Sequence, residues 1–293
     1  MKIAPSKAGV RTIHHLERPK AELTMLIEQA PPGRSETCRP TADTLSTPYQ
    51  AVRNIFQILI RDDHSLPHEF PAKVEGNTRS LRSAHPEAAY HLLNAEEIRG
   101  FLAGNFESDV VNAYDSLAPY AYKCDLARLC LLFVHGGLYV DLGIRFLTRL
   151  EPPLGSGLVA FRDLLVSSKN SWAVLNGLFF ATAGRPELRT AIDLIVQNCK
   201  NKYYGATALD PTGPSAFGRA IAICNNVLDY WIGDAHVKSN WLQKKTFVFV
   251  TPDGKSLALN TKREGGNLKE LGLDGTNNYN TFWRSRQVYG ERS

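Results

Sequence analysis

The chain has 293 residues, of which 43% are hydrophobic and 22% are charged, and its formal net charge is +5. This composition is typical of a globular protein that buries a full core without disulfide or metal crosslinks. The basic residues are scattered rather than clustered with aromatic residues, which argues against nucleic-acid binding. The mild positive charge fits an anionic small substrate or a membrane surface equally well. The five cysteines are odd in number and form no CxxC pair, which favours free thiols in a reducing compartment.

No stretch of the sequence reaches the roughly 18 apolar residues that span a bilayer, and the N-terminus lacks the apolar core of a signal peptide. We therefore expect a cytoplasmic protein, for which peripheral membrane association stays open. Residues 30–48 are rich in Pro, Ser and Thr and show no apolar period, a pattern typical of a linker or arm. We expect an N-terminal extension over residues 1–50, with a short helix at 20–29, and one domain over 51–293. The sequence predicts no oligomeric state.

From residue 51 onward, strand and helix patterns alternate along the chain. The predicted strands are 54–60, 88–93, 138–140, 157–161 and 246–250, and the predicted helices are 76–83, 95–103, 118–135, 186–198 and 215–230. Asn94 and Glu97 form a capping-box pattern at the start of the second helix. This alternation predicts an α/β fold with a central, mostly parallel sheet and helices on both faces.

The stretch from residue 118 to residue 148 carries the clearest chemistry. Asp125 and Arg128 are three residues apart on a predicted helix, so they share one face. Gly136-Gly137 ends that helix, and the short strand that follows delivers Asp141 at its C-terminal end. The carboxyl ends of such strands are where open α/β sheets form ligand sites.

The order of these residues resembles glycosyltransferase family 32, whose relatives include Golgi mannosyl- and galactosyltransferases and the large glucosylating toxins. The family pattern, Asp-x-x-Arg followed by Gly-Gly-x-Tyr-x-Asp-x-Asp, is similar to Asp125-Leu126-Ala127-Arg128 and to Gly136-Gly137-Leu138-Tyr139-Val140-Asp141-Leu142-Gly143. Weaker similarities follow in the right order over residues 51–290. The resemblance implies a GT-A-like, Rossmann-like domain. It also implies retaining transfer of a hexose from a UDP- or GDP-sugar to a hydroxyl acceptor on a glycan, lipid or protein.

The resemblance also implies the site residues. Asp141, Asp125 and Arg128 are the implied catalytic residues, with Arg128 orienting Asp125 toward the donor sugar. The implied donor-binding residues are Gln57, Ile58, Asp125, Arg128, Tyr139, Asp141, Asn176, Thr212, Gly213 and Trp283. Structural alternatives stay open: a buried ion pair for Asp125 and Arg128, core packing for Tyr139 and Trp283, a simple turn at Thr212-Gly213, and a loop cap at Asn176.

One departure from the family pattern concerns the metal. Gly143 stands where the family has the second acid, which binds a divalent cation directly. Mg²⁺ or Mn²⁺ at a diphosphate usually takes one or two carboxylates plus phosphate oxygens. Three outcomes follow: a metal held weakly by Asp141 with Asn277 or Asn278, a protein cation in its place with Arg145 the nearest in sequence, or a degenerate protein that binds nucleotide sugar or glycan without efficient turnover.

Overall fold

The structure, a computed structural model, describes residues 49–63, 65–164, 168–225, 227–239, 245–262, 268–273 and 277–290. The predicted helix at 20–29 and almost all of the predicted N-terminal extension lie outside the described residues, so the division at residue 50 stays a prediction. No helix in the described ranges is long and apolar enough to cross a bilayer.

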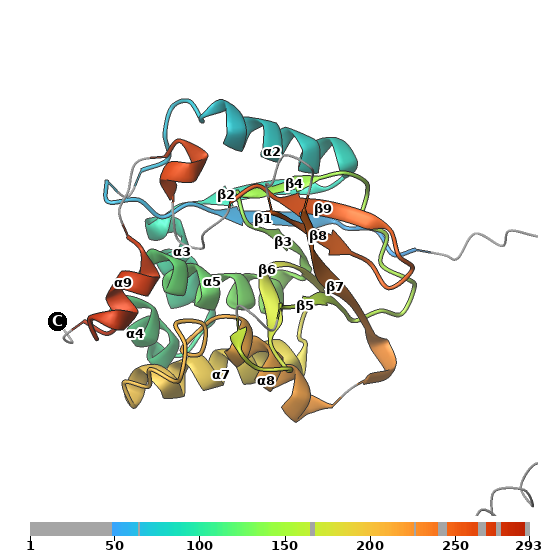
Figure 1. The fold of residues 1–293 in the computed structure, drawn as a ribbon. Helices are drawn as coiled ribbons and strands as arrows, with labels where there is room; N and C mark the ends of the chain where they lie inside the picture. Colours follow the sequence, from blue (N-terminus) through green and yellow to red (C-terminus); the bar gives the residue numbers. More distant parts are fainter. Residues whose placement is uncertain are drawn as a thin grey trace, which may run out of the picture. The chain divides into compact units, whose positions relative to one another are not determined.

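The strands of the described residues form one curled sheet. They are β1 (Asn54–Ile58), β2 (Ala89–Leu93), β3 (Gly137–Val140), β4 (Ile144–Phe146), β5 (Leu158–Arg162), β6 (Val174–Ala181), β7 (Tyr230–Ser239), β8 (Lys245–Val250) and β9 (Ser256–Asn260). Their order in the sheet is β2-β1-β3-β6-β5-β7-β8-β9-β4 (Figure 1).

The predicted α/β class is confirmed, but the prediction of a mostly parallel sheet is wrong. Parallel pairing joins β1 to β2, β1 to β3, and β5 to β7. The other neighbouring pairs in the described sheet are antiparallel. Three of these antiparallel pairs join consecutive strands, β5 to β6, β7 to β8 and β8 to β9, and antiparallel neighbours do not need the helical crossover that parallel pairing requires.

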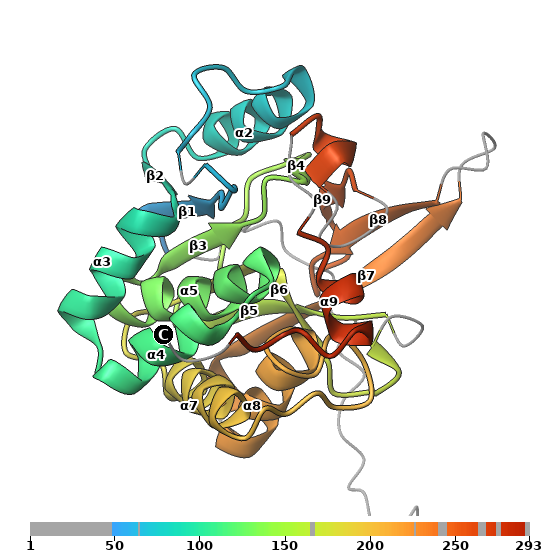
Figure 2. The same ribbon diagram turned by 90° about the vertical axis from the view of Figure 1, so that its left-hand side faces the viewer.

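Helices cover both faces of the sheet, as predicted. They are α2 (Ala72–Ala84), α3 (Ala95–Asn105), α4 (Ser108–Ser116), α5 (Tyr120–His135), α7 (Pro186–Lys200), α8 (Pro214–Cys224) and α9 (Tyr279–Arg284). Helix α2 lies on one face and α3, α5, α7 and α8 lie on the other, while β7 and β8 extend past the helices as a ribbon (Figures 1 and 2). Side chains along β3 point alternately to the two faces of the sheet. Leu138 and Val140 pack in the core with α2, and Tyr139 packs in the core with α5.

Local sequence signals explain several element boundaries. The Asn94 side chain accepts from the backbone N–H of Glu97 at 3.0 Å, and the Glu97 carboxylate accepts from the Asn94 N–H at 2.8 Å, which confirms the capping box. The helix predicted at 215–230 ends earlier, at Cys224, because Asn225 adopts the left-handed conformation with φ 48°. Helices α4 and α9 and strands β4, β6, β7 and β9 have no counterpart among the predicted elements.

The Gly136-Gly137 pair has the structural role that its sequence indicates. The two residues have φ values of 62° and 119°, a region that favours glycine. A Cβ on Gly137 would lie 2.5 Å from the carbonyl oxygen of Asn54. Glycine therefore ends α5 and lets β3 pack closely beside β1.

The connection between β3 and β4 shapes the site. Only residues 141–143 link the two strands, although five strands separate them in the sheet order. The sheet must therefore curl back on itself to place β4 next to β9. The backbone N–H of Asp141 donates to the carbonyl of Gly177 at 2.8 Å, which fixes this turn against β6.

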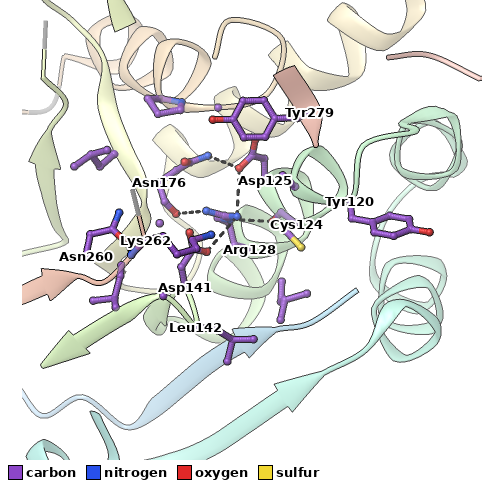
Figure 3. A pocket seen from close by; sticks show the side chains of 18 of the residues that line it. Tyr120, Cys124, Asp125, Arg128, Asp141, Leu142, Asn176, Asn260, Lys262 and Tyr279 are labelled. Atoms are coloured by element: carbon purple, nitrogen blue, oxygen red, sulfur yellow. Dashed lines mark hydrogen bonds and ion pairs between the residues drawn. The ribbon is translucent and has the colours of Figure 1, made fainter. Parts of the chain in front are cut away.

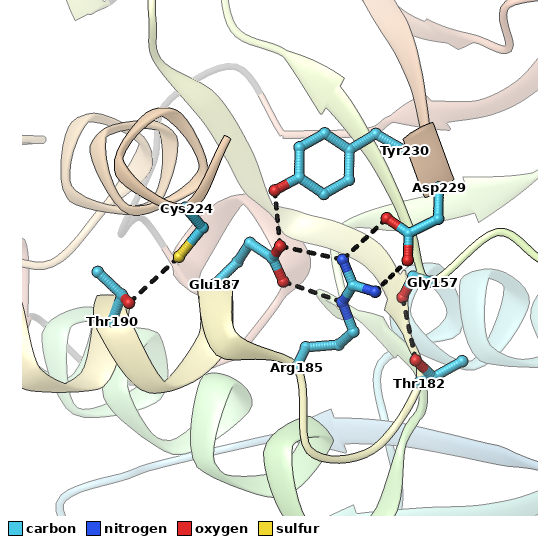
Figure 4. A network of polar contacts seen from close by, with 8 residues as sticks. All are labelled: Gly157, Thr182, Arg185, Glu187, Thr190, Cys224, Asp229 and Tyr230. Carbon is cyan, nitrogen blue, oxygen red and sulfur yellow. Dashed lines mark hydrogen bonds and ion pairs between the residues drawn. The ribbon is translucent and has the colours of Figure 1, made fainter. Parts of the chain in front are cut away.

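A buried ion network joins the start of α7 to the start of β7 (Figure 4). Arg185 forms bidentate contacts with Glu187 and with Asp229, and the Tyr230 hydroxyl donates to Glu187 at 2.6 Å. Glu187 has no solvent exposure. Each charged side chain has a partner of opposite sign, and the second acid, Asp229, keeps 26% of its side chain exposed, so the network fixes these elements without isolating a buried charge.

Candidate functional site

A cavity of about 300 Å³ lies at the C-terminal ends of β1 and β3, inside the curl of the sheet (Figure 3). Its walls come from α5, β6, β8, β9 and the segment before α8. Most of its lining is apolar, including Ile58, Leu142, Leu175 and Phe249. A concave, mainly apolar cavity with a few convergent polar groups is the usual form of a small-molecule site.

Arg128 is the centre of the polar part of this cavity. Helix α5 carries it, and its side chain is only 5% exposed. Its guanidinium donates to the carbonyl oxygens of Asn176 at 2.7 Å and of Cys124 at 3.0 Å. Its Nη2 lies 3.3 Å from Oδ1 of Asp125 and 3.4 Å from Oδ1 of Asp141. One rigid cation thus holds two carboxylates that are distant in sequence at fixed positions.

Asp125 receives hydrogen bonds from two other predicted site residues. The Asn176 Nδ2 donates to its Oδ1 at 2.9 Å, and the Thr212 hydroxyl donates to its Oδ2 at 2.7 Å. Burial raises the pKa of the Asp125 carboxyl, while Arg128 and these two hydrogen bonds oppose that rise. Gly213 also lines the cavity, and a Cβ there would lie 3.6 Å from Asp125 Oδ2. These four residues therefore meet at one point.

Asp141 lies at the end of β3, as the sequence predicts, and faces the same cavity. Its Oδ1 accepts the hydroxyl proton of Tyr139 at 2.9 Å. The Tyr139 ring is buried, and its centroid lies 4.5 Å from the Arg128 guanidinium carbon. Tyr139 thus packs in the core and positions the acid, and its contact with a donor stays a prediction.

Two predicted donor-binding residues lie elsewhere. The Gln57 amide is fully buried and donates to the Val140 carbonyl, while its oxygen accepts from Thr78 and Tyr90. Trp283, on α9, donates from Nε1 to the Tyr204 carbonyl at 2.7 Å and is not among the residues that line the cavity.

The residues around Asp141 do not fit a divalent cation. Gly143 offers no ligand, and the side chain of Asn278 caps α9 by accepting from the N–H of Asn280 at 2.9 Å. The Asn277 amide bonds the backbone of Tyr120 and Ala118. Within the described ranges, no group of three or more His, Cys, Asp or Glu side chains is placed to hold a metal ion.

Sequence reasoning missed two charged residues that line the cavity, Asp163 and Lys262. Burial raises the pKa of the Asp163 carboxyl to about 6, and its buried Oδ2 has no hydrogen-bond partner among the described residues. Asp163 directly follows β5, the same pattern that identified Asp141. Lys262 has no comparable signal, because the pairing of β9 with β4 brings it to the cavity.

Comparisons with known proteins agree with the resemblance. Residues 71–158, which contain Asp125, Arg128 and Asp141, match the family described as glycosyltransferase sugar-binding region containing DXD motif. An uncharacterized glycosyltransferase of Acanthamoeba polyphaga mimivirus is 33% identical over 103 residues, which are 35% of this chain and 39% of that protein. Inositol phosphoceramide mannosyltransferase 3 of Schizosaccharomyces pombe is 31% identical over 87 residues, or 30% of this chain and 24% of that protein.

Among solved structures, the PaToxG glycosyltransferase is similar with a TM-score of 0.46 and 17% identity, over 60% of this chain and 71% of that one. The chain spans well under half of the length of the two curated relatives. The family match and these relatives support the assignment of the central region to a glycosyltransferase family 32-like group.

Proposed function

We propose that the protein is a retaining glycosyltransferase that moves a hexose from a UDP- or GDP-sugar to a hydroxyl acceptor. The observation that carries this proposal is that Asp125, Arg128 and Asp141 converge in one cavity. All three residues belong to the stretch of sequence that matches a sugar-binding family. The buried Asp125 and the half-buried Asp141 share one guanidinium and supply acceptors for sugar hydroxyls, and their geometry is set before the donor binds.

The proposed reaction needs no covalent nucleophile. The bond between the anomeric carbon and the β-phosphate oxygen breaks, and its electron pair leaves with the nucleoside diphosphate. The acceptor oxygen forms the new bond on the same face of the sugar, and its proton passes to the departing phosphate oxygen. Asp125 and Asp141 bind the sugar hydroxyls during this step, and Arg128 keeps both acids in place.

The acceptor is a glycan, a lipid or a protein in this proposal. The curated relative from Schizosaccharomyces pombe is called an inositol phosphoceramide mannosyltransferase. A mannose donor with a lipid acceptor is therefore the first combination to test, although only part of that protein is similar to this chain.

Release of nucleoside diphosphate from a panel of UDP- and GDP-sugars tests the proposal, with and without candidate acceptors. Asp141→Asn should lower the rate by about 10- to 100-fold, the range for a lost hydrogen bond to a charged group. The matched control is Asp193→Asn, because Asp193 pairs with Arg189 on the exposed face of α7. A wild-type protein that neither binds nor turns over any of these donors would overturn the proposal.

Gly143 favours one alternative, a protein that binds nucleotide sugar or glycan without efficient turnover. The missing carboxylate at this position weakens the site of the cation that the family uses. The same panel separates the two functions, because the alternative predicts nucleotide-sugar binding with no release of nucleoside diphosphate under any condition.

A further inference from the structure

The space beside Gly143 is filled by the side chain of Lys262, two residues after the end of β9. A Cβ on Gly143 would lie 2.9 Å from Cε, 3.0 Å from Cγ and 3.2 Å from Cδ of Lys262. The aliphatic chain of Lys262 thus crosses the point from which a side chain at position 143 would start. Glycine at 143 and lysine at 262 are therefore sterically matched.

The backbone fixes this arrangement. Ile144 pairs with Asn260 in the antiparallel ladder of β4 and β9. Beyond that pair, the N–H and the hydroxyl of Thr261 both donate to the Gly143 carbonyl, at 2.7 and 2.8 Å. The amide of Asn77 bonds the Thr261 hydroxyl at 3.0 Å. Lys262 follows directly, so its Cα position is set by this ladder.

The Lys262 ammonium is available to a ligand. Lys262 lines the cavity and is half-buried, and Figure 3 shows it on the same side of the cavity as Asp141 and Asn260. Its side chain forms no ion pair or hydrogen bond with the part of the chain that the structure describes. Arg128, by contrast, already uses its donors on Asn176, Cys124 and the two acids.

Arg145, the nearest cation in the sequence, does not take this role. It is exposed and is not among the residues lining the cavity. The Lys73 ammonium donates to the carbonyl oxygens of Thr261 and Glu270, at 2.6 and 2.9 Å, and so supports the segment that carries Lys262.

We propose that Lys262 replaces the divalent cation at the diphosphate of the donor. The absence of a side chain at Gly143 leaves the space that the lysine side chain needs. This inference rests on the proposed function. The ammonium binds the diphosphate and offsets the negative charge that builds on it as the sugar–phosphate bond breaks. A compact ammonium is a good phosphate ligand, and it repels a metal ion from the same position.

Binding of UDP and GDP to the full chain tests the inference by calorimetry, once with EDTA and once with Mn²⁺. The wild-type dissociation constant of the better nucleotide should change by less than about threefold between the two buffers. Lys262→Met should weaken binding by about 10- to 100-fold, and Lys262→Arg should restore most of it. Lys255→Met is the matched control, because Lys255 is exposed and pairs with Asp253 outside the cavity.

A double variant, Gly143→Asp with Lys262→Ala, removes the cation and adds the missing carboxylate. Its nucleotide affinity should become dependent on Mn²⁺ by about tenfold or more. Binding by the wild type that needs Mn²⁺, or Lys262→Met binding that equals wild type, overturns the inference and leaves the proposed function standing. No binding of either nucleotide in either buffer overturns the proposed function and the inference together.

Discussion

Replacing Gly177 by alanine tests whether the position of Asp141 controls the reaction. Gly177 lies on β6 opposite the end of β3, and a Cβ there would lie 2.7 Å from Oδ2 and 3.3 Å from Cγ of Asp141. Carbon–oxygen contacts of this kind settle at about 3.3–3.6 Å, so the carboxylate must withdraw by roughly 0.6–0.9 Å.

That shift disturbs the other contacts of the same carboxylate. Its Oδ1 accepts from Tyr139 at 2.9 Å and lies 3.4 Å from Arg128, so withdrawal stretches at least one of them. Misplacing a reacting group by about 1 Å costs on the order of 100-fold in rate. We therefore expect kcat/KM to fall by about 10- to 100-fold. Overpacking should cost about 1–3 kcal/mol of unfolding free energy.

The assay is release of nucleoside diphosphate from the best donor, at a temperature below the melting transition of both proteins. Gly100→Ala is the matched control, because Gly100 lies within α3 with nothing within 4 Å of the new Cβ. It should keep full activity and raise stability by up to about 1 kcal/mol. A Gly177→Ala protein with kcat/KM within twofold of wild type would refute the role of Asp141.

Two further predictions concern stability. Arg128→Met leaves the buried Asp125 and the half-buried Asp141 without their cation and should cost about 3–5 kcal/mol, whereas Arg189→Met, on an exposed ion pair, should cost less than about 1 kcal/mol; equal melting temperatures for the two variants would contradict this. Burial raises the pKa of Asp163 to about 6, above that of the unfolded chain, so its ionisation lowers stability as pH rises from about 4 to 6. Asp163→Asn should therefore raise the melting temperature more at pH 7.5 than at pH 4.5, and an equal gain at both pH values would show that Asp163 does not titrate in this way.

Much of the fold follows from local signals in the sequence. Residues 118–141 behave as predicted, because an apolar helix, a glycine pair with positive φ and a short strand are each specified by neighbouring residues. Neighbouring residues do not specify whether two strands pair parallel or antiparallel. Strands β5 and β6 pair antiparallel, and nothing in the sequence between them distinguishes a long hairpin from a crossover. The mostly parallel sheet was therefore the wrong expectation.

The residues of the site also differ in how far neighbouring sequence specifies their positions. Asp125, Arg128 and Asp141 were predictable because they lie within 17 residues of one another, on one helix and the strand that follows it. Lys262 was not predictable, since its contact with Gly143 depends on the β4–β9 ladder and on Thr261. Arg145 is nearer in sequence but lies on β4 with its side chain exposed, so sequence distance was a poor guide to the cation that lies beside Gly143.

A crystal structure of the protein with the nucleoside diphosphate of its best donor tests the central claim most directly. We predict that a diphosphate oxygen lies about 2.7–3.2 Å from the Lys262 ammonium, that the diphosphate reaches the cavity beside Asp125, Arg128 and Asp141, and that no metal bridges it to the protein. A nucleotide bound outside this cavity, or a metal ion joining the diphosphate to Asp141, would contradict the account.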